Sequence, residues 1–255
     1  MTSLQRYWDA RAALNFILGG SGAGLIIAAA FIHPASPWPV AAGLAFIATG
    51  LFAVWLETGR KLRALHVLFN PFTSWMTREA FAALVLFPVG LGAFLTLKFL
   101  PVAAVLALVF LWCQARILRA SRGIPAWRVA QVVPLIIAAG FAEGASLAVV
   151  LVQTPLAAAL LAIALIARLI AWSAYRGEVK SEALEGAGRA LQLGAIAALV
   201  LIGAGFYFTQ AALPAAVLAG VVTLASGWWL KFTLVTRAAF TQGFSLPRQP
   251  VRGTR

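Results

Sequence analysis

The sequence predicts an all-α membrane protein built as a bundle of eight transmembrane helices. Of its 255 residues, 62% are hydrophobic and only 11% are Asp, Glu, Lys or Arg, whereas about 25% of the residues of a soluble domain are charged. Mean hydropathy is +0.93. The apolar residues also gather into runs of about 20, which is the length that crosses a bilayer. A soluble protein of this size needs more polar surface, so that class is excluded.

Prolines and charged residues separate eight apolar runs. Prolines stand where several even-numbered runs begin, a position at which the missing N–H would be unpaired anyway. Inside the third run, Pro88 is followed by Gly90 and Gly92, which predicts a kinked or broken helix. We expect one transmembrane domain over 1–240 and a basic tail over 241–255, with helices at 12–32, 38–58, 79–97, 101–118, 130–151, 155–175, 190–210 and 213–235.

The positive charges sort to one side of such a bundle. The net charge is +13, and every Lys and Arg except Lys98 and Arg168 falls in the terminal segments or in the loops that share their side. Lys231 is counted here with the C-terminal charges. The positive-inside rule then places both termini and the 59–78 loop in the cytoplasm. Basic residues between apolar runs indicate membrane orientation rather than nucleic-acid binding. We expect a multi-pass protein of a bacterial or archaeal cytoplasmic membrane.

Few residues in the chain could hold a metal or a haem. There is one aspartate, Asp9, and one cysteine, Cys113. An internal disulfide and a cysteine-ligated cluster are therefore excluded. A membrane haem needs histidines at bilayer depth. His33 is predicted at the outer end of the first helix and His66 in a cytoplasmic loop, so we expect no metal site and no haem in this chain.

Two features inside the predicted helices have both structural and functional interpretations. The glycine-rich stretch over 19–24 allows close helix packing through Gly20 and Gly24, or else provides a flat wall for a cofactor ring. Glu143 and Arg168 lie at membrane depth, where ionisable groups are costly. Arg168 either extends to the cytoplasmic interface or pairs with Glu143, which requires it to stretch outward or the two helices to be staggered. Glu143 is either a hydrogen-bonded structural acid or a step in a proton path.

The loop between the second and third helices is long and mixes Arg, His, Trp and two carboxylates. An interfacial turn with a Trp anchor and basic lipid contacts explains the Arg and Trp residues. It does not explain Glu57 and Glu79 at the edge of the hydrocarbon. Donors, aromatic rings and titratable groups together suit a quinone head group, which takes up protons when it is reduced.

Two segments of this loop resemble the membrane-anchor family of dimethyl sulfoxide reductase. They are GRKLRALHVLFN at 59–70 and TSWMTRE at 73–79. The likeness is closest to the branch found with phenylacetyl-CoA:acceptor oxidoreductases. The stretch RAALNFILGGSGAG at 11–24 is similar to the same branch. Together these motifs cover about the first third of the chain.

The resemblance implies a haem-free anchor that exchanges two electrons with a quinone, either menaquinone or ubiquinone. It implies two partners, a ferredoxin-like iron–sulfur subunit and a molybdopterin catalytic subunit. Many relatives face the periplasm, but the charge pattern of this chain predicts docking on the cytoplasmic face. The chain would not act on the partner's substrate. By similarity, Glu79 matches an acid linked to quinol chemistry. Glu57 stands where dimethyl sulfoxide reductase anchors carry a His in a His-Leu-Gly run, so either His66 or Glu57 itself would handle the proton.

The predicted site combines helix 1 with this loop. Proton transfer is assigned to Glu79 with His66 or Glu57, and head-group binding to four further residues, Asn15, Gly19, Trp75 and Arg78. A secondary transporter or channel that uses Glu143 and Arg168 is the main alternative. A membrane-embedded enzyme acting on lipid is the other, and the lack of a Ser/His/Asp arrangement counts against it.

Overall fold

The computed structural model confirms the helical prediction. It describes residues 3–5, 8–32, 36–57 and 61–241, and within them eight helices are long and apolar enough to cross a membrane. The first is continuous through α1 (Ala10–Leu14), the π-helical η1 (Asn15–Gly19) and α2 (Gly20–Ile32). The others are α3 (Trp38–Glu57), α4 (Trp75–Thr96), α5 (Leu100–Ala120), α7 (Val132–Val152), α8 (Pro155–Glu178), α9 (Glu182–Tyr207) and α10 (Ala212–Thr236).

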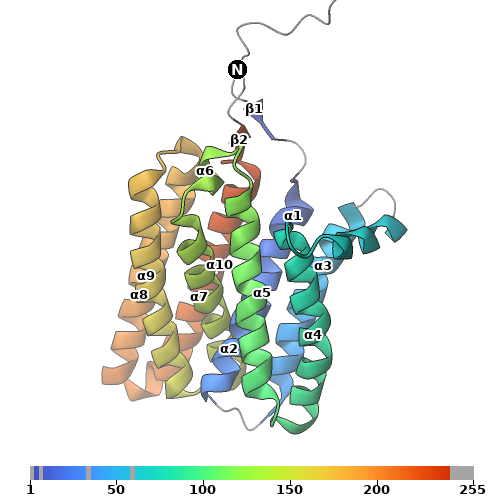
Figure 1. Ribbon diagram of the computed structural model, residues 1–255. Coiled ribbons are helices and arrows are strands. Elements are labelled where there is room, and N and C mark those ends of the chain that lie inside the picture. Colours follow the sequence, from blue (N-terminus) through green and yellow to red (C-terminus); the bar gives the residue numbers. More distant parts are fainter. Residues whose placement is uncertain (1–2, 6–7, 33–35, 58–60, 242–255) are drawn as a thin grey trace, which may run out of the picture.

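Short elements complete the chain. Two 3₁₀ segments, η2 (Lys61–Phe69) and η3 (Thr209–Ala211), precede α4 and α10, and α6 (Pro125–Arg128) precedes α7. Two-residue strands, β1 (Ser3–Leu4) and β2 (Phe240–Thr241), pair antiparallel. The two ends of the described chain therefore meet at one end of the bundle (Figure 1), as an even number of spans requires. Thr241 belongs to this strand pair, and 242–255 lie outside the described residues. Which membrane face this end occupies stays a prediction.

Two helices begin four or more residues earlier than the apolar pattern predicts. α4 starts at Trp75, because Ser74 Oγ accepts a hydrogen bond from the Thr77 N–H and caps it. α9 starts at Glu182, and its first turn contains Glu182 and Glu185. Carboxylates there complement the helix dipole. Apolar periodicity marks the membrane core of a helix, whereas these polar first turns extend beyond it.

Of the kink or break predicted at Pro88, the break is wrong. α4 runs without interruption from Trp75 to Thr96, with Pro88 on its exposed side. A proline removes only one N–H from the helix. Neighbouring groups and small local adjustments compensate for this in transmembrane helices. A proline that faces outward also keeps its ring away from the packed core.

The first transmembrane helix lies at the centre of the bundle. α2 packs against α3, α5 and α7, while α4 packs on α5, and α8 and α10 pack on α7. Figure 1 shows α3 and α4 towards one side and α8 and α9 towards the other. Almost every residue of α2 is buried. A central helix of this kind touches protein on all sides, which explains why its sequence is apolar or small all round.

The predicted close packing at Gly24 is confirmed. A Cβ added at Gly24 would lie 1.9 Å from the carbonyl oxygen of Gly140 on α7. A Cβ added at Gly144 would lie 1.9 Å from the Gly24 carbonyl carbon. The backbones of α2 and α7 therefore touch directly, which only small residues permit.

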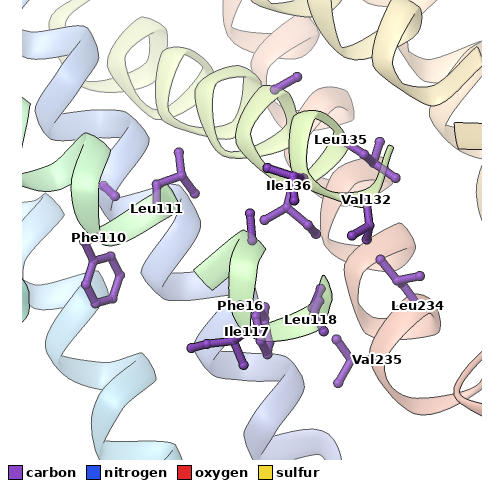
Figure 2. Close-up of a cluster of buried hydrophobic side chains, with 14 of the residues drawn as sticks. Phe16, Phe110, Leu111, Ile117, Leu118, Val132, Leu135, Ile136, Leu234 and Val235 are labelled. Carbon is purple, nitrogen blue, oxygen red and sulfur yellow. The ribbon is translucent and has the colours of Figure 1, made fainter. Parts of the chain in front are cut away.

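Part of a large hydrophobic core lies at the end of the bundle that carries the termini. Phe16 and Ile117 lie close together there, with Leu118, Leu234 and Val235 nearby (Figure 2). These side chains come from η1, α5 and α10 and are almost fully buried. This core fixes η1, α5 and α10 in place around the candidate site.

Candidate functional site

The π-helical segment η1 is the unusual feature of the first transmembrane helix. A π-turn shifts the backbone hydrogen-bond register, and such turns are frequent at functional sites. Two backbone carbonyls of this segment accept hydrogen bonds from side chains of other helices. The Asn15 carbonyl accepts from Gln114 Nε2 of α5 at 2.9 Å, and the Phe16 carbonyl accepts from Lys231 Nζ of α10 at 3.1 Å. Two polar side chains from different helices thus hold the segment.

Two glycines make room for these side chains. A Cβ at Gly19 would stand 2.5 Å from Gln114 Nε2, and one at Gly20 would stand 2.6 Å from Lys231 Nζ. The predicted role of Gly19 was to bind a cofactor. The structure places the Gln114 amide against this glycine, and the role of Gly19 in cofactor binding stays a prediction.

Asn15 and Glu79, two of the predicted site residues, are brought together. Asn15 Nδ2 donates a hydrogen bond to Glu79 Oε1 at 3.2 Å across the interface of η1 and α4. Both side chains are buried, with exposed fractions of 5% and 6%. A carboxyl group in such a place needs polar partners. The amide of Asn15 therefore connects Glu79 to the face of the first transmembrane helix.

A cavity of about 280 Å³ opens on the other side of Asn15. Its lining combines two predicted site residues, Asn15 and Glu57, with an apolar surface from Trp8, Ala12, Phe16, Val54 and Ile117. The Trp8 ring stacks on Phe16 with centroids 5.8 Å apart. It also lies 4.8 Å from the Trp127 ring. The cavity therefore has rigid aromatic walls, one amide and one half-buried carboxyl group.

Trp75 and Arg78 lie outside this cavity lining. Arg78 donates from Nε to the Pro71 carbonyl at 2.8 Å and from Nη2 to the Phe72 carbonyl at 2.6 Å. Its guanidinium also lies 4.2 Å from the centroid of the Trp75 ring, and Arg116 lies 4.5 Å from the same ring. Two cations thus flank one indole. These contacts give Arg78 the task of holding the turn before α4.

His66 is not brought to the cavity either. It lies on the exposed side of η2, with its ring centroid 5.4 Å from that of Phe69. Of the two alternatives for proton handling, Glu57 lines the cavity and His66 does not. Within the described residues no group of three or more His, Cys, Asp or Glu side chains is placed to hold a metal ion. His33 is outside the described residues.

A buried ion pair lies behind the π-segment. Lys231 Nζ lies 2.7 Å from Glu143 Oε2, and neither side chain is more than 1% exposed. Ser21 Oγ lies 2.7 Å from the same carboxylate oxygen and accepts a hydrogen bond from Trp228 Nε1 at 3.0 Å. The Lys231 ammonium thereby connects Glu143 to the Phe16 carbonyl, and Phe16 also lines the cavity.

Two expectations for the charged groups need correction. Lys231 was counted with the C-terminal charges, but it points into the bundle from inside α10 and is buried. Arg168 does not extend to the interface, because its side chain is fully buried and Nη1 donates to the Thr223 carbonyl at 3.1 Å. The sequence could have identified Lys231 as a candidate, because it stands within the apolar run 213–235 and an ionisable residue at that depth is a functional candidate.

Comparison with known proteins adds no assignment. No family model matches the chain, and no curated protein is detectably similar to it in sequence. The candidate site therefore consists of a hydrogen-bonded π-segment, an aromatic cavity with one carboxyl group, and a buried ion pair behind the cavity wall.

Proposed function

We propose that the chain is the membrane anchor and quinone-reactive subunit of an oxidoreductase complex. In this proposal the anchor passes two electrons between an iron–sulfur partner subunit and membrane quinone. The observation that carries it is the cavity, in which an aromatic surface meets Asn15 and Glu57. The resemblance of residues 59–79 to the dimethyl sulfoxide reductase anchors is consistent with it. A molybdopterin subunit completes the proposed complex.

The cavity suits a single substituted ring. Small-molecule sites typically measure about 300–1,000 Å³ and are mostly apolar with a few polar groups. At about 280 Å³, this cavity accommodates a head group and leaves the isoprenoid tail among the helices and lipid. Trp8 and Phe16 offer stacking surfaces for the ring. Because their own rings stack with each other, these walls are held in place before a ligand arrives.

Two carboxyl groups are placed to handle protons. Reduction of a quinone to a quinol consumes two electrons and two protons. Glu57 lines the cavity and lies at the end of α3, so it can donate a proton within the cavity and be reprotonated from the aqueous side. Glu79 does not line the cavity, but it accepts a hydrogen bond from Asn15, which does. We assign the direct transfer to Glu57 and a supporting role to Glu79.

The proposed docking surface lies beside the cavity. η2 packs against α3 and α4, and it presents Leu65 and Phe69 to the outside. Phe72, in the turn that follows, is 89% exposed. Exposed apolar side chains together with the basic residues of this loop suit contact with a partner subunit at the membrane surface.

The experiment that tests this function uses the intact complex in its native membrane. Glu57→Gln should reduce quinone-coupled turnover strongly, while electron transfer from the substrate to a soluble dye acceptor stays unchanged. Glu185→Gln is the matched control, because Glu185 is an exposed carboxylate paired with Arg189 on α9. Equal quinone-coupled turnover of both variants and the wild type would contradict the proposal.

A secondary transporter or channel is the second candidate. The buried pair of Glu143 and Lys231, with Arg168 nearby, is the observation that favours it, because intramembrane charges often mark ion pathways. Purified chain in proteoliposomes separates the two functions. Ion or proton flux that Glu143→Gln abolishes would support transport, whereas tight vesicles together with quinone binding support the anchor.

A further inference from the structure

Gly227 lies beside two buried charged side chains in the middle of the bundle, because a Cβ added there would lie close to Glu143 Oε1 and Arg168 Nη1. Glu143 of α7, Arg168 of α8 and Thr223 of α10 are all fully buried. Arg168 makes one hydrogen bond, to the Thr223 carbonyl. Within the described structure, Arg168 Nε and Nη2, Glu143 Oε1 and Thr223 Oγ1 have no hydrogen-bond partner. Three neighbouring helices thus contribute four buried polar atoms without a partner.

The depth of this region makes the missing partners costly. Gly227 lies nine residues before the end of α10, at Thr236, or about 14 Å at the helical rise of 1.5 Å per residue. The hydrocarbon core is about 30 Å thick, so this is close to its middle. Lipid supplies no hydrogen bonds there, and an unsatisfied buried group costs about 1–3 kcal/mol, or more when it is charged.

The kinds of atom identify the missing ligand. The guanidinium nitrogens of Arg168 are donors, whereas Glu143 Oε1 is an acceptor. An anion could satisfy the donors only, and a cation could satisfy the acceptor only. Water both donates and accepts, and buried water typically makes two to four hydrogen bonds to otherwise unsatisfied groups. The mixture of donors and an acceptor therefore favours water.

The spacing also fits water. A Cβ built on Gly227 would lie 2.8 Å from Glu143 Oε1 and 3.0 Å from Arg168 Nη1, so these two atoms are at most 5.8 Å apart. Two hydrogen bonds of about 2.9 Å through one water span such a gap. The other oxygen of the Glu143 carboxylate, Oε2, already contacts Lys231 and Ser21. Oε1 is therefore the oxygen that is left to accept from a water.

We propose that α7, α8 and α10 enclose at least one bound water molecule between Glu143 and Arg168. This hydrated ionic site, defined by Glu143, Arg168, Thr223 and Gly227, lies at mid-membrane depth. It is separate from the cavity lined by Asn15 and Glu57, and it does not depend on the quinone function. The absence of a side chain at Gly227 keeps the space between the carboxylate and the guanidinium open.

The test is a structure of the protein in lipid nanodiscs at a resolution that shows ordered water. The expected result is a density peak within hydrogen-bonding distance of both Glu143 Oε1 and the Arg168 guanidinium. A direct contact between the two side chains with no peak between them would overturn the proposal. So would an anion at this place, revealed by an anomalous peak after bromide replaces chloride in crystals.

A pair of glycine variants gives an independent measurement. Gly227→Ala places a methyl group against both atoms and should remove the water peak and lower the melting temperature. Gly203→Ala is the control, because a Cβ there meets nothing within 4 Å among the described residues, and it should keep both. An unchanged peak and melting temperature in Gly227→Ala would contradict the proposed site.

Discussion

Lys231 Nζ lies 2.7 Å from Glu143 Oε2 inside the bundle, with the two side chains 1% and 0% exposed. Removal of one partner from a buried ion pair leaves an uncompensated charge and costs about 3–5 kcal/mol. Arg168 Nη1 lies at most 5.8 Å from the other oxygen of Glu143 and compensates part of that charge, so Lys231→Met should lower the free energy of unfolding in detergent by about 3 kcal/mol, the lower end of this range. It also frees the Phe16 carbonyl in the π-segment. Denaturant titration followed by far-UV circular dichroism measures the change.

Two further variants sharpen this prediction. Adding Glu143→Gln to Lys231→Met also removes the carboxylate that faces the buried Arg168, so the double variant should be less stable than Lys231→Met. Arg189→Met breaks an exposed pair with Glu185 on α9 and should cost about 0.5 kcal/mol or less. If Lys231→Met is as mild as Arg189→Met, the buried pair does not stabilise the fold.

Gly24 provides a prediction about helix packing. Because a Cβ would stand 1.9 Å from the Gly140 carbonyl oxygen, Gly24→Ala must push α2 away from α7. Overpacking of this kind typically lowers stability by about 1–3 kcal/mol. The methyl group would meet the backbone of Gly140, which cannot move aside as a side chain can, so we expect a value at the upper end of this range. The melting temperature should fall clearly below that of Gly203→Ala. Equal melting temperatures would show that the two helices are further apart than described.

Glu79 provides a prediction about the supporting carboxyl group. Glu79→Gln keeps the shape of the side chain and can still bond to Asn15, so the complex should assemble normally. It removes a titratable group, and positioned proton-transfer groups contribute about 10²–10⁴-fold to a rate. Because Glu79 acts through Asn15, a decrease near the lower end, on the order of 100-fold, is expected in quinone-coupled turnover. Unchanged turnover with the native quinone would remove Glu79 from the site.

Much of the fold could be predicted from the sequence because bilayer crossing is a simple constraint. Eight runs of about 20 apolar residues became eight helices, with most ends shifted by one to three residues. The larger errors came from polar first turns, as at Trp75 and Glu182, where a cap extends the helix beyond its apolar core. The break predicted at Pro88 did not occur, because prolines are tolerated within transmembrane helices, whereas they commonly end helices in soluble proteins.

The candidate site was less predictable because its contacts connect distant segments. Asn15 and Glu79 were both selected, but their hydrogen bond depends on how the first helix packs on α4. Gln114 and Lys231 were missed as partners of the π-segment. Nothing in the local sequence shows that Gly19 and Gly20 admit side chains from α5 and α10. His66 was selected as a possible substitute for the His of the family motif, and the structure leaves it exposed on η2.

Photolabelling with a quinone that carries a photoreactive head group tests the central claim most directly. In the native complex, the account predicts that mass spectrometry finds the label on the segments that line the cavity, around Trp8–Phe16 and Val54–Glu57. Excess native quinone should compete with this labelling, and Glu57→Gln should leave its position unchanged. Competable labelling confined to another part of the chain, or none at all, would contradict the quinone-site account.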